Sequence, residues 1–373
     1  MGRLTLGLIV NPIAGMGGSV GLKGTDTAAI LSEARARGAA PQAAARARVV
    51  LDALAAARPG MELLAAPGAM GERIAQGAGL RPTVVGAPAE GETSAADTRA
   101  AAEAMAAAGA RLILFAGGDG TARDMAAALA DRVPVIGVPA GVKMHSAVYA
   151  TSPRAAADLA LRALESDIDA RPREVMDIDE EAFRAGAVSA RLYGYLSVPY
   201  APHLTQGVKT GGVSGDREAL AGIAAEIGGR MEAGRLYILG PGTTTRAVAQ
   251  ALGLPKTLLG VDLVRDGALV AADATEDGIL RALAESRPGA IVVTPIGGQG
   301  HFLGRGNQQI GARVVRAVGL DWLLVAATPE KLASLGDGTL HVDTGDPDLD
   351  RALSGWRRVI TGYGTEAVCR VAP

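Results

Sequence analysis

Short hydrophobic runs alternate with longer Ala- and Leu-rich segments along the first part of the chain. Residues 4–10 form a continuous apolar run that ends at Asn11 and Pro12. The run is too short for most helices, so it predicts a buried strand. Residues 43–57 carry apolar side chains at helical spacing and predict a helix. By the same criteria, strands are expected at 62–66, 83–87, 112–116 and 133–138, and helices at 95–108, capped by Ser94, and at 121–130.

This alternation of strands and helices predicts a parallel sheet with helices on both faces. Residues 144–166 are again Ala- and Leu-rich, and Pro153 is expected to break or restart a helix there. No long helical pattern separates the apolar runs at 175–178 and 190–198, which indicates an antiparallel or mixed portion. The glycine-rich stretch 207–215 is predicted to be a mobile loop.

The strand and helix pattern returns in the second half, with a strand at 236–239, a helix at 243–252 and a strand at 258–264. Further elements are expected at 268–272, 290–294 and 320–326, and a helix is expected after Thr275. The C-terminal part is predicted to hold short strands at 340–342, 359–362 and 367–371. The predicted fold class is α/β: a Rossmann-like N-terminal domain (1–170), a second mixed α/β domain (171–335) and a short β-containing tail (336–373). The tail is expected to pack back on the N-terminal domain.

Composition narrows the classes of function. The chain has 373 residues, with 37 Lys and Arg against 39 Asp and Glu, and so lacks the basic footprint of a nucleic-acid-binding protein. No apolar run approaches the ~18–20 residues of a membrane span, and the N-terminus has no secretory pattern. Cys369 is the single cysteine and fits a reducing compartment. A cytoplasmic protein without nucleic-acid or membrane partners is expected.

The strongest chemical signal lies between the strand at 112–116 and the following helix. Gly117, Gly118, Gly120 and Thr121 surround Asp119, and glycine amides at a helix N-terminus are suited to a phosphate. A carboxylate would repel a bare phosphate, so Asp119 implies Mg²⁺, a hydroxyl to deprotonate, or both. The alternative is a tight turn in which Asp119 or Thr121 caps the helix.

The run 117–121 resembles the GGDGT signature of the NAD kinase and diacylglycerol kinase superfamily. The loop with Asn11, Gly15, Gly17 and Gly18 is similar to its NPxxGxG loop, and residues 137–141 resemble its third loop. The whole chain looks most like the ATP-NAD kinase branch that includes the AcoX proteins of acetoin-catabolism operons, which share the runs 141–146 and 294–300.

The resemblance implies an NAD kinase type of fold and a specific chemistry. Asp119 would be the base or metal organiser for phosphoryl transfer from a nucleoside triphosphate, ATP, to a hydroxyl such as the 2′-OH of NAD. The glycines would line the nucleotide, and Mg²⁺ would assist if the protein is catalytic. It is also expected to be a homo-oligomer.

The third loop departs from the lipid kinase pattern GTxND, because Gly141, Val142, Lys143, Met144 and His145 occupy those positions. Lys143 can pair with a phosphate and His145 can bond a ribose or base, or His145 can simply pack against the next helix. The missing Asn-Asp pair leaves a second interpretation open: a catalytically silent, AcoX-like nucleotide-binding or regulatory protein of acetoin catabolism. A lipid or small-alcohol kinase has little support, because no amphipathic membrane-binding helix is present.

Two loops in the second half are also candidates for nucleotide binding. Gly240, Gly242, Thr243, Thr244 and Thr245 join a strand to a helix without a Walker sequence, so either an anion site or a well-capped turn fits. Asp262, at the end of the next strand, can reach a ribose hydroxyl.

A glycine-rich loop at 294–309 interleaves polar residues with glycines, and it is expected to face the ligand. Arg305 is a plausible phosphate clamp, and His301 is either a general base or a solvated side chain. His203 and His341 have no partner at metal-ligand spacing, and no protein metal site is predicted. The candidate nucleotide-binding residues of this loop are Thr294, Gly297, Gly298, Gln299, Gly300, Arg305 and Asn307.

Overall fold

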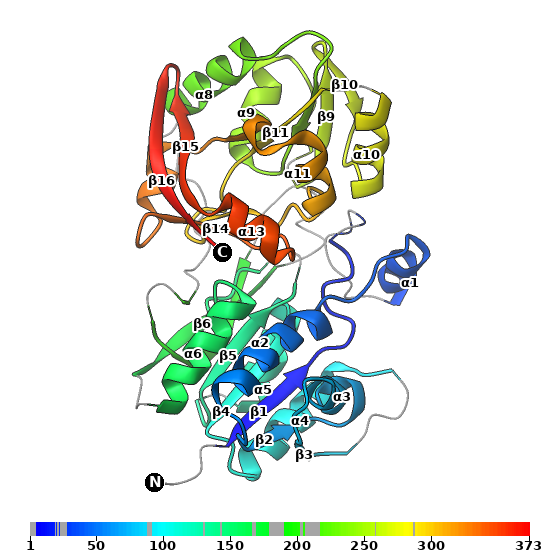
Figure 1. The fold of residues 1–373 in the computed structure, drawn as a ribbon, viewed down its shortest axis with the longest axis vertical. Helices are drawn as coiled ribbons and strands as arrows, with labels where there is room; N and C mark the ends of the chain where they lie inside the picture. The colour runs from blue at the N-terminus through cyan, green and yellow to red at the C-terminus, as the bar shows by residue number, and fades with distance from the viewer. Residues whose placement is uncertain are drawn as a thin grey trace. The chain divides into compact units, whose positions relative to one another are not determined.

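A computed structural model shows the fold (Figure 1). The structure describes residues 5–18, 20, 22, 28–87, 92–129, 131–141, 144–165, 169–178, 190–201, 204–205, 217–257, 259–285 and 288–373. The chain divides into two compact units. Unit 1 comprises Met1–Met16, Gly24–Ala36 and Ala40–Val208, and unit 2 comprises Gly17–Lys23, Arg37–Ala39 and Lys209–Pro373.

Unit 1 is built on a five-stranded parallel sheet with the order β3-β2-β1-β4-β5. From β1 the chain continues to β2 on one side, whereas β4 lies on the other side of β1. The position between β1 and β4 is therefore a switch point, where open α/β sheets bind their ligands outside the carboxyl ends of the strands. The strands are β1 (Leu6–Val10), β2 (Leu63–Ala65), β3 (Thr83–Val84), β4 (Leu112–Gly117) and β5 (Val135–Pro139).

Helices cover both faces of this sheet (Figure 1), which confirms the predicted α/β class. Leu6, Leu8 and Val10 of β1 pack with α2 and α6. Ile9, which lies between Leu8 and Val10 in the strand, points to the opposite face, which holds α4 and α5. The helices of unit 1 are α1 (Ala28–Ala36), α2 (Ala43–Ala57), α3 (Glu72–Gly77), α4 (Ala95–Ala107), α5 (Asp119–Leu129) and α6 (Pro153–Glu165), with a 3₁₀ turn η1 (Gly68–Met70).

One helix is shorter than its pattern predicted. Pro153 is the first residue of α6, because its missing N–H and fixed φ suit a helix start. Residues 144–152 are not helical. Instead, the Ala147 amide donates to the Glu174 carbonyl at 2.9 Å, so this segment lies beside the strand β6.

Strands β6 (Ala170–Ile178) and β7 (Ala190–Pro199) form the predicted antiparallel portion. Val175, Leu196 and Val198 are buried in the same core cluster as α5. This packing places both strands in unit 1, which continues to Val208, whereas the sequence suggested a domain boundary at residue 170. The loop predicted at 207–215 lies outside the described residues.

Unit 2 repeats the arrangement with the sheet order β10-β9-β8-β11-β13. Strands β8, β11 and β13 are parallel, and β9 runs antiparallel to both of its neighbours, β8 and β10. From β8 the chain continues to β9 on one side and β11 lies on the other, so a second switch point lies between β8 and β11. The strands are β8 (Leu236–Leu239), β9 (Asp262–Arg265), β10 (Ala268–Ala271), β11 (Gly289–Val293) and β13 (Leu323–Val325).

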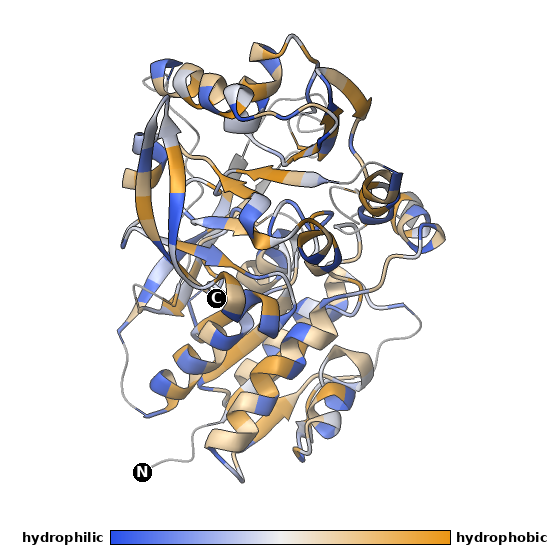
Figure 2. Ribbon diagram, turned by 45° about the horizontal axis from the view of Figure 1, so that its top comes forward, coloured by the Kyte–Doolittle hydropathy of each residue, from blue (hydrophilic) through white to orange (hydrophobic). Residues whose placement is uncertain are grey.

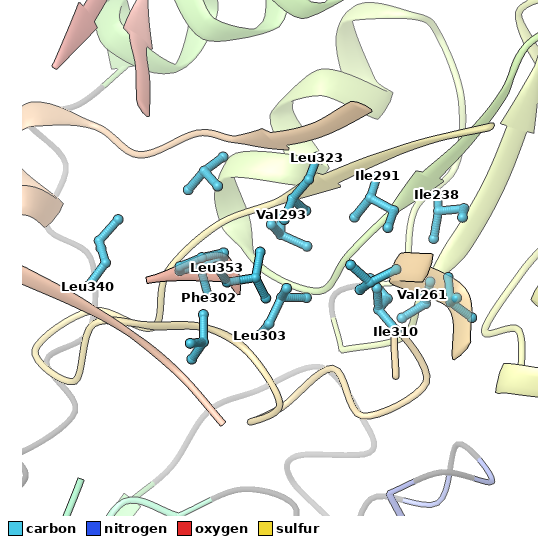
Figure 3. Packing of buried hydrophobic residues seen from close by; sticks show 14 of the residues in the cluster. Ile238, Val261, Ile291, Val293, Phe302, Leu303, Ile310, Leu323, Leu340 and Leu353 are labelled. Atoms are coloured by element: carbon cyan, nitrogen blue, oxygen red, sulfur yellow. The ribbon is translucent and has the colours of Figure 1, made fainter. Parts of the chain in front are cut away.

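This sheet also has two buried faces. One packs with α8 (Arg217–Gly229) and α9 (Thr243–Ala251), and the other with α10 (Glu276–Glu285) and α11 (Ala312–Val318). Figure 3 shows aliphatic side chains of the second face beside residues of β12. Figure 2 shows hydrophobic residues along the central strands, whereas the helices carry both hydrophobic and polar residues.

The C-terminal tail completes a four-stranded sheet within unit 2, with the order β12-β14-β16-β15. Its strands pair with β12, which comes from the glycine-rich loop region before residue 335. The expected boundary at residue 335 is therefore not where the units divide. The elements are β12 (His301–Leu303), β14 (Thr339–Val342), β15 (Gly355–Gly362) and β16 (Thr365–Ala372), with η3 (Leu320–Trp322), α12 (Pro329–Ala333) and α13 (Pro347–Leu353) between. Among the described residues, no helix has both the length and the apolar character needed to span a membrane.

Candidate functional site

The switch point of unit 1 joins the loops that follow β1 and β4. Val10 lies opposite Ala116 at the ends of these strands. Directly beyond them, the Asn11 side-chain amide donates to the Thr121 hydroxyl at 3.0 Å, and the Asn11 backbone amide donates to the Ala116 carbonyl at 2.9 Å. The predicted residues Asn11 and Thr121, 110 positions apart, are thus in contact.

Most glycines of these loops are required by close packing. A Cβ on Gly117 would lie 2.3 Å from the Thr121 Oγ1, and one on Gly141 would lie 2.8 Å from the Gly118 Cα. Gly120 differs, because a Cβ there would meet no atom within 4 Å. Packing therefore explains Gly117, Gly118 and Gly141, whereas the open space at Gly120 is where a ligand can approach the first turn of α5.

Asp119 is the first residue of α5 and is 7% exposed. Its carboxylate accepts hydrogen bonds from the backbone amides of His145 (2.6 Å) and Ser146 (3.1 Å), and the His145 Nδ1 lies 3.3 Å from Oδ2. An ionised carboxylate only accepts, so a hydrogen bond at this ring contact places a hydrogen on Nδ1. The structure thus joins the predicted residues Asp119 and His145. Lys143 lies outside the described residues.

Two further residues, Tyr149 and Ser146, hold this loop in place. The Tyr149 hydroxyl donates to the Gly118 carbonyl at 2.5 Å, and its ring lies 5.4 Å from that of Phe115. The Ser146 hydroxyl donates to the Met176 carbonyl of β6 at 2.8 Å. Ser146 closes the sequence run 141–146, but its contact with β6 could not be read from that run.

Helix α5 is also fixed to its neighbour α4 by an ion pair. The Asp124 carboxylate lies 2.9 Å from the Arg99 guanidinium. Burial raises the pKa of Asp124, and the charges of Arg123 and Arg99 oppose this rise. Asp124 therefore anchors the helix that presents Asp119.

The N-terminal glycines serve different units. Gly15 has a φ of +84°, and a Cβ there would lie 2.4 Å from the Ala140 carbonyl oxygen, so it packs within unit 1. Gly17 and Gly18 belong to unit 2. A Cβ on Gly18 would overlap the side-chain oxygen of Gln308, which explains this glycine by packing.

The switch point of unit 2 carries three polar side chains that we call the Thr–Thr–Lys cluster: Thr244, Thr294 and Lys331. Thr294 Oγ1 lies 3.2 Å from Thr244 Oγ1, and the Lys331 ammonium donates to these atoms at 3.0 and 3.1 Å, respectively. Thr244 and Thr294 are predicted residues, and Lys331 was missed. The available signal was Thr328-Pro329, a helix start directly after a third parallel strand.

The rest of the 240–245 loop forms its own turn. The Thr245 hydroxyl is 2.6 Å from the Gly240 carbonyl oxygen and 3.0 Å from that of Gly242. Gly242 has a φ of +125°, and a Cβ there would lie 2.7 Å from Thr294 Cγ2. Thr243 is exposed. Thr245 therefore shapes the turn, while Thr244 faces the cluster.

Asp262 lies at the same edge of the sheet, opposite Leu239, but its carboxylate already has four neighbours. It accepts from the Thr257 amide and hydroxyl and from the Asp273 amide, each at 2.7 Å. The Lys256 ammonium lies 3.2 Å away, and both side chains of this pair are at most 1% exposed. These contacts explain Asp262 as a structural residue, and its proposed bond to a ribose stays a prediction.

The loop 294–309 turns its polar side chains inward. Asn307 bonds the Phe302 carbonyl and the Gly304 amide, and Arg305 Nε lies 3.6 Å from the Asp343 carboxylate with both side chains buried. His301 is 1% exposed and its ring lies 5.2 Å from that of His341, so the expectation of a solvated histidine was wrong: β12 places it in the interior.

The remaining residues of this loop lie on either side of its turn. Gln299 is buried, and Gly300, with a φ of +76°, would place a Cβ 2.7 Å from the Thr339 carbonyl oxygen. Gly297 and Gly298 are half-buried, and the Gly298 amide donates to the Ser334 hydroxyl at 3.3 Å. Only Thr294 of this loop reaches the switch point through a described contact.

Comparisons with known proteins identify the family. The model of the ATP-NAD kinase N-terminal domain matches residues 6–168, and that of the ATP-NAD kinase C-terminal domain matches residues 234–371. No curated protein matches the chain. A crystal structure from Bacillus anthracis strain Sterne, of a protein assigned as a diacylglycerol kinase, aligns at 16% identity with a TM-score of 0.26. That alignment covers 72% of this chain and 64% of the other, less than two thirds of its length, and is too weak to support an argument. The two domain matches show that the chain belongs to the ATP-NAD kinase family.

Proposed function

We propose that this protein binds a nucleoside triphosphate and transfers a phosphoryl group to a hydroxyl acceptor such as the 2′-OH of NAD. The observation that supports it most directly is the position of Asp119. Asp119 is the first residue of α5 at the switch point of unit 1. It lies beside the close approach of the Gly118 and Gly141 backbones. Membership of the ATP-NAD kinase family supports the same reaction class.

The first turn of α5 is suited to holding phosphate. The first N–H groups of a helix have no acceptor within it, and they favour an anion. Gly120 leaves the space beside this turn open. In this proposal the phosphates approach at Gly120, and the Asn11–Thr121 hydrogen bond keeps the two loops in position.

Asp119 acts on the acceptor hydroxyl in this proposal. A carboxylate offers about four acceptor positions, and the His145 and Ser146 amides and the His145 ring occupy three of them. The remaining position is available to a substrate O–H, which Asp119 orients and from which it takes the proton. The contribution of a positioned base of this kind is about 10²–10⁴-fold in rate.

Magnesium fits this site as a companion of the nucleotide. Among the described residues, no three His, Cys, Asp or Glu side chains come together as a metal site. Mg²⁺ is usually bound through phosphates, water and one or two carboxylates, and Asp119 can supply one of these. When bound, the ion neutralises charge on the phosphate oxygens.

A second candidate function is nucleotide binding without catalysis, as in the AcoX-like interpretation. One observation favours it: His145 stands in the loop where related lipid kinases have a polar Asn-Asp pair, and its amide and ring both contact Asp119. A carboxylate that serves to fix this loop would have a structural role and need not accept a proton.

Calorimetric titration of ATP and of NAD, with and without Mg²⁺, separates these candidates when followed by mass-spectrometric detection of phosphorylated NAD. The kinase proposal predicts binding of both ligands and a product that is lost in Asp119→Asn. Binding without product, for NAD and for other hydroxyl acceptors, would leave only the second candidate. Failure of the wild-type protein to bind either nucleotide would overturn both.

A further inference from the structure

Three neighbouring parallel strands of unit 2 each deliver one polar side chain to the same edge of the sheet. Thr244 follows β8, Thr294 follows β11 and Lys331 follows β13, and these strands are adjacent in the order β8-β11-β13. The residues are separated by 50 and 37 positions in sequence. Their contact is therefore produced by the sheet and not by a local turn.

The hydrogen bonds within the Thr–Thr–Lys cluster leave one hydroxyl hydrogen unused among its three side chains. An ammonium group only donates, so both hydroxyl oxygens accept from Lys331. The two hydroxyls also share one hydrogen bond with each other. Each hydroxyl has a single hydrogen, so whichever threonine donates to the other, the second hydroxyl hydrogen points away from the three atoms. A charged donor beside a hydroxyl hydrogen that the cluster itself does not use is suited to an anion.

The two loops that carry the threonines contain no acidic residue that would repel an anion. Residues 240–246 and 294–305, which carry both threonines, contain no Asp or Glu, and they include Arg246. Thr244 and Thr294 are buried, so their hydroxyls are held in place before any ligand binds. Burying polar groups in this way is costly unless hydrogen bonds compensate, and Lys331 supplies those bonds.

We infer that the Thr–Thr–Lys cluster binds a phosphoryl group of a nucleotide, with Lys331 as the residue that pairs with its charge. The inference rests on the proposed function for the identity of the ligand as a nucleotide. Two sources carry the same chemistry, the triphosphate of the donor and the pyrophosphate of a dinucleotide acceptor. The simpler alternative is a purely structural role, in which Lys331 only ties the loops after β8 and β11 together.

The test is calorimetric titration of the full-length protein with ATP, NAD and inorganic tripolyphosphate, comparing wild type with Lys331→Ala. Loss of a charge-assisted hydrogen bond predicts that affinity for at least one phosphate ligand falls about 10- to 100-fold. A fall for ATP and tripolyphosphate alone assigns the cluster to the donor, and a fall for NAD assigns it to the dinucleotide. Arg358→Ala is the matched control, because it removes one positive charge of unit 2 from a side chain that is 83% exposed; its affinities should equal those of wild type.

A second variant keeps the inference testable if Lys331→Ala does not fold. Thr294→Val retains Lys331 and nearly the same volume but removes one hydroxyl, and about a 3- to 10-fold loss of affinity is expected. If either folded variant has lower thermal stability but binds every phosphate ligand as wild type does, the cluster is structural and the inference is wrong. If wild type binds ATP or NAD and both variants bind all three ligands as wild type does, this inference fails and the proposed function stands. If wild type binds none of the three ligands, both fail.

Discussion

In unit 1, Asn11 and Thr121 meet where β1 and β4 end, and in unit 2, Thr244 and Thr294 meet where β8 and β11 end. Both pairs lie at the position where the strand order reverses. The units differ in the charge beside that pair: the Asp119 carboxylate in unit 1 and the Lys331 ammonium in unit 2.

This difference shows that the sheet places the site and the added charge decides its chemistry. A carboxylate suits a hydroxyl and repels a phosphate, whereas an ammonium attracts a phosphate. Unit 1 is therefore the candidate for the acid-base step, with phosphate reaching it at the open turn beside Gly120. Unit 2 is the candidate for holding phosphate charge.

The largest expected effect on stability concerns Asp262, a buried acid at the edge of the unit 2 sheet. Asp262→Ala removes the partner of the buried Lys256 ammonium, and breaking a buried ion pair costs about 3–5 kcal/mol. Urea unfolding should show this loss, while the folded variant keeps its affinity for ATP. Lost nucleotide binding at unchanged stability would instead make Asp262 a ligand-binding residue.

Asp119→Ala tests whether the acid of unit 1 also holds its loop. The backbone amides of His145 and Ser146 would lose their acceptor, and a buried unsatisfied group costs about 1–3 kcal/mol. The free energy of unfolding should therefore fall by about 2–4 kcal/mol, measured by urea denaturation. Asp169→Ala, at a side chain 73% exposed, should change it by about 0.5 kcal/mol or less. Equal effects of the two substitutions would contradict the loop contact.

Two glycines of unit 1 separate packing from ligand access. Gly141→Ala forces a Cβ to within 2.8 Å of the Gly118 Cα, and overpacking of this kind costs about 1–3 kcal/mol. Gly120→Ala meets no neighbour and should stabilise α5 by about 0.5–1 kcal/mol. Titration of ATP should nevertheless show weaker binding to Gly120→Ala. Unchanged affinity would place the phosphates elsewhere.

The smallest effect concerns an acid remote from both switch points. Asp346 caps α13 and pairs with Arg316, which lowers the pKa of Asp346 to about 2. Because the unfolded-state pKa is 3.8, the stability that this charge contributes is complete above that value and is lost as the pH falls toward 2. Asp346→Asn keeps a capping oxygen and removes the charge. Its deficit in unfolding free energy relative to wild type should shrink between pH 5 and pH 2, and a constant deficit would contradict the assignment.

Hydrophobic spacing was sufficient to predict the α/β class and several elements to the residue, such as α2 (Ala43–Ala57) and β8 (Leu236–Leu239). The GGDGT-like run led directly to Asp119. Lys331 was not found, because its role depends on two threonines far away in sequence. Polar residues such as Arg305 resembled ligand contacts in the sequence, but an ion pair with Asp343 explains that side chain within the fold. Local patterns predict elements, whereas the partners of polar side chains depend on which loops the sheet brings together.

The most direct test of the central claim, that nucleotides bind at the carboxyl ends of both sheets, is amide hydrogen exchange of the wild-type protein with and without ATP and NAD. The account predicts slower exchange in peptides that cover 117–122 in unit 1 and 241–246 and 294–300 in unit 2. If bound nucleotide leaves the exchange of these segments unchanged and slows it only elsewhere, the account is wrong.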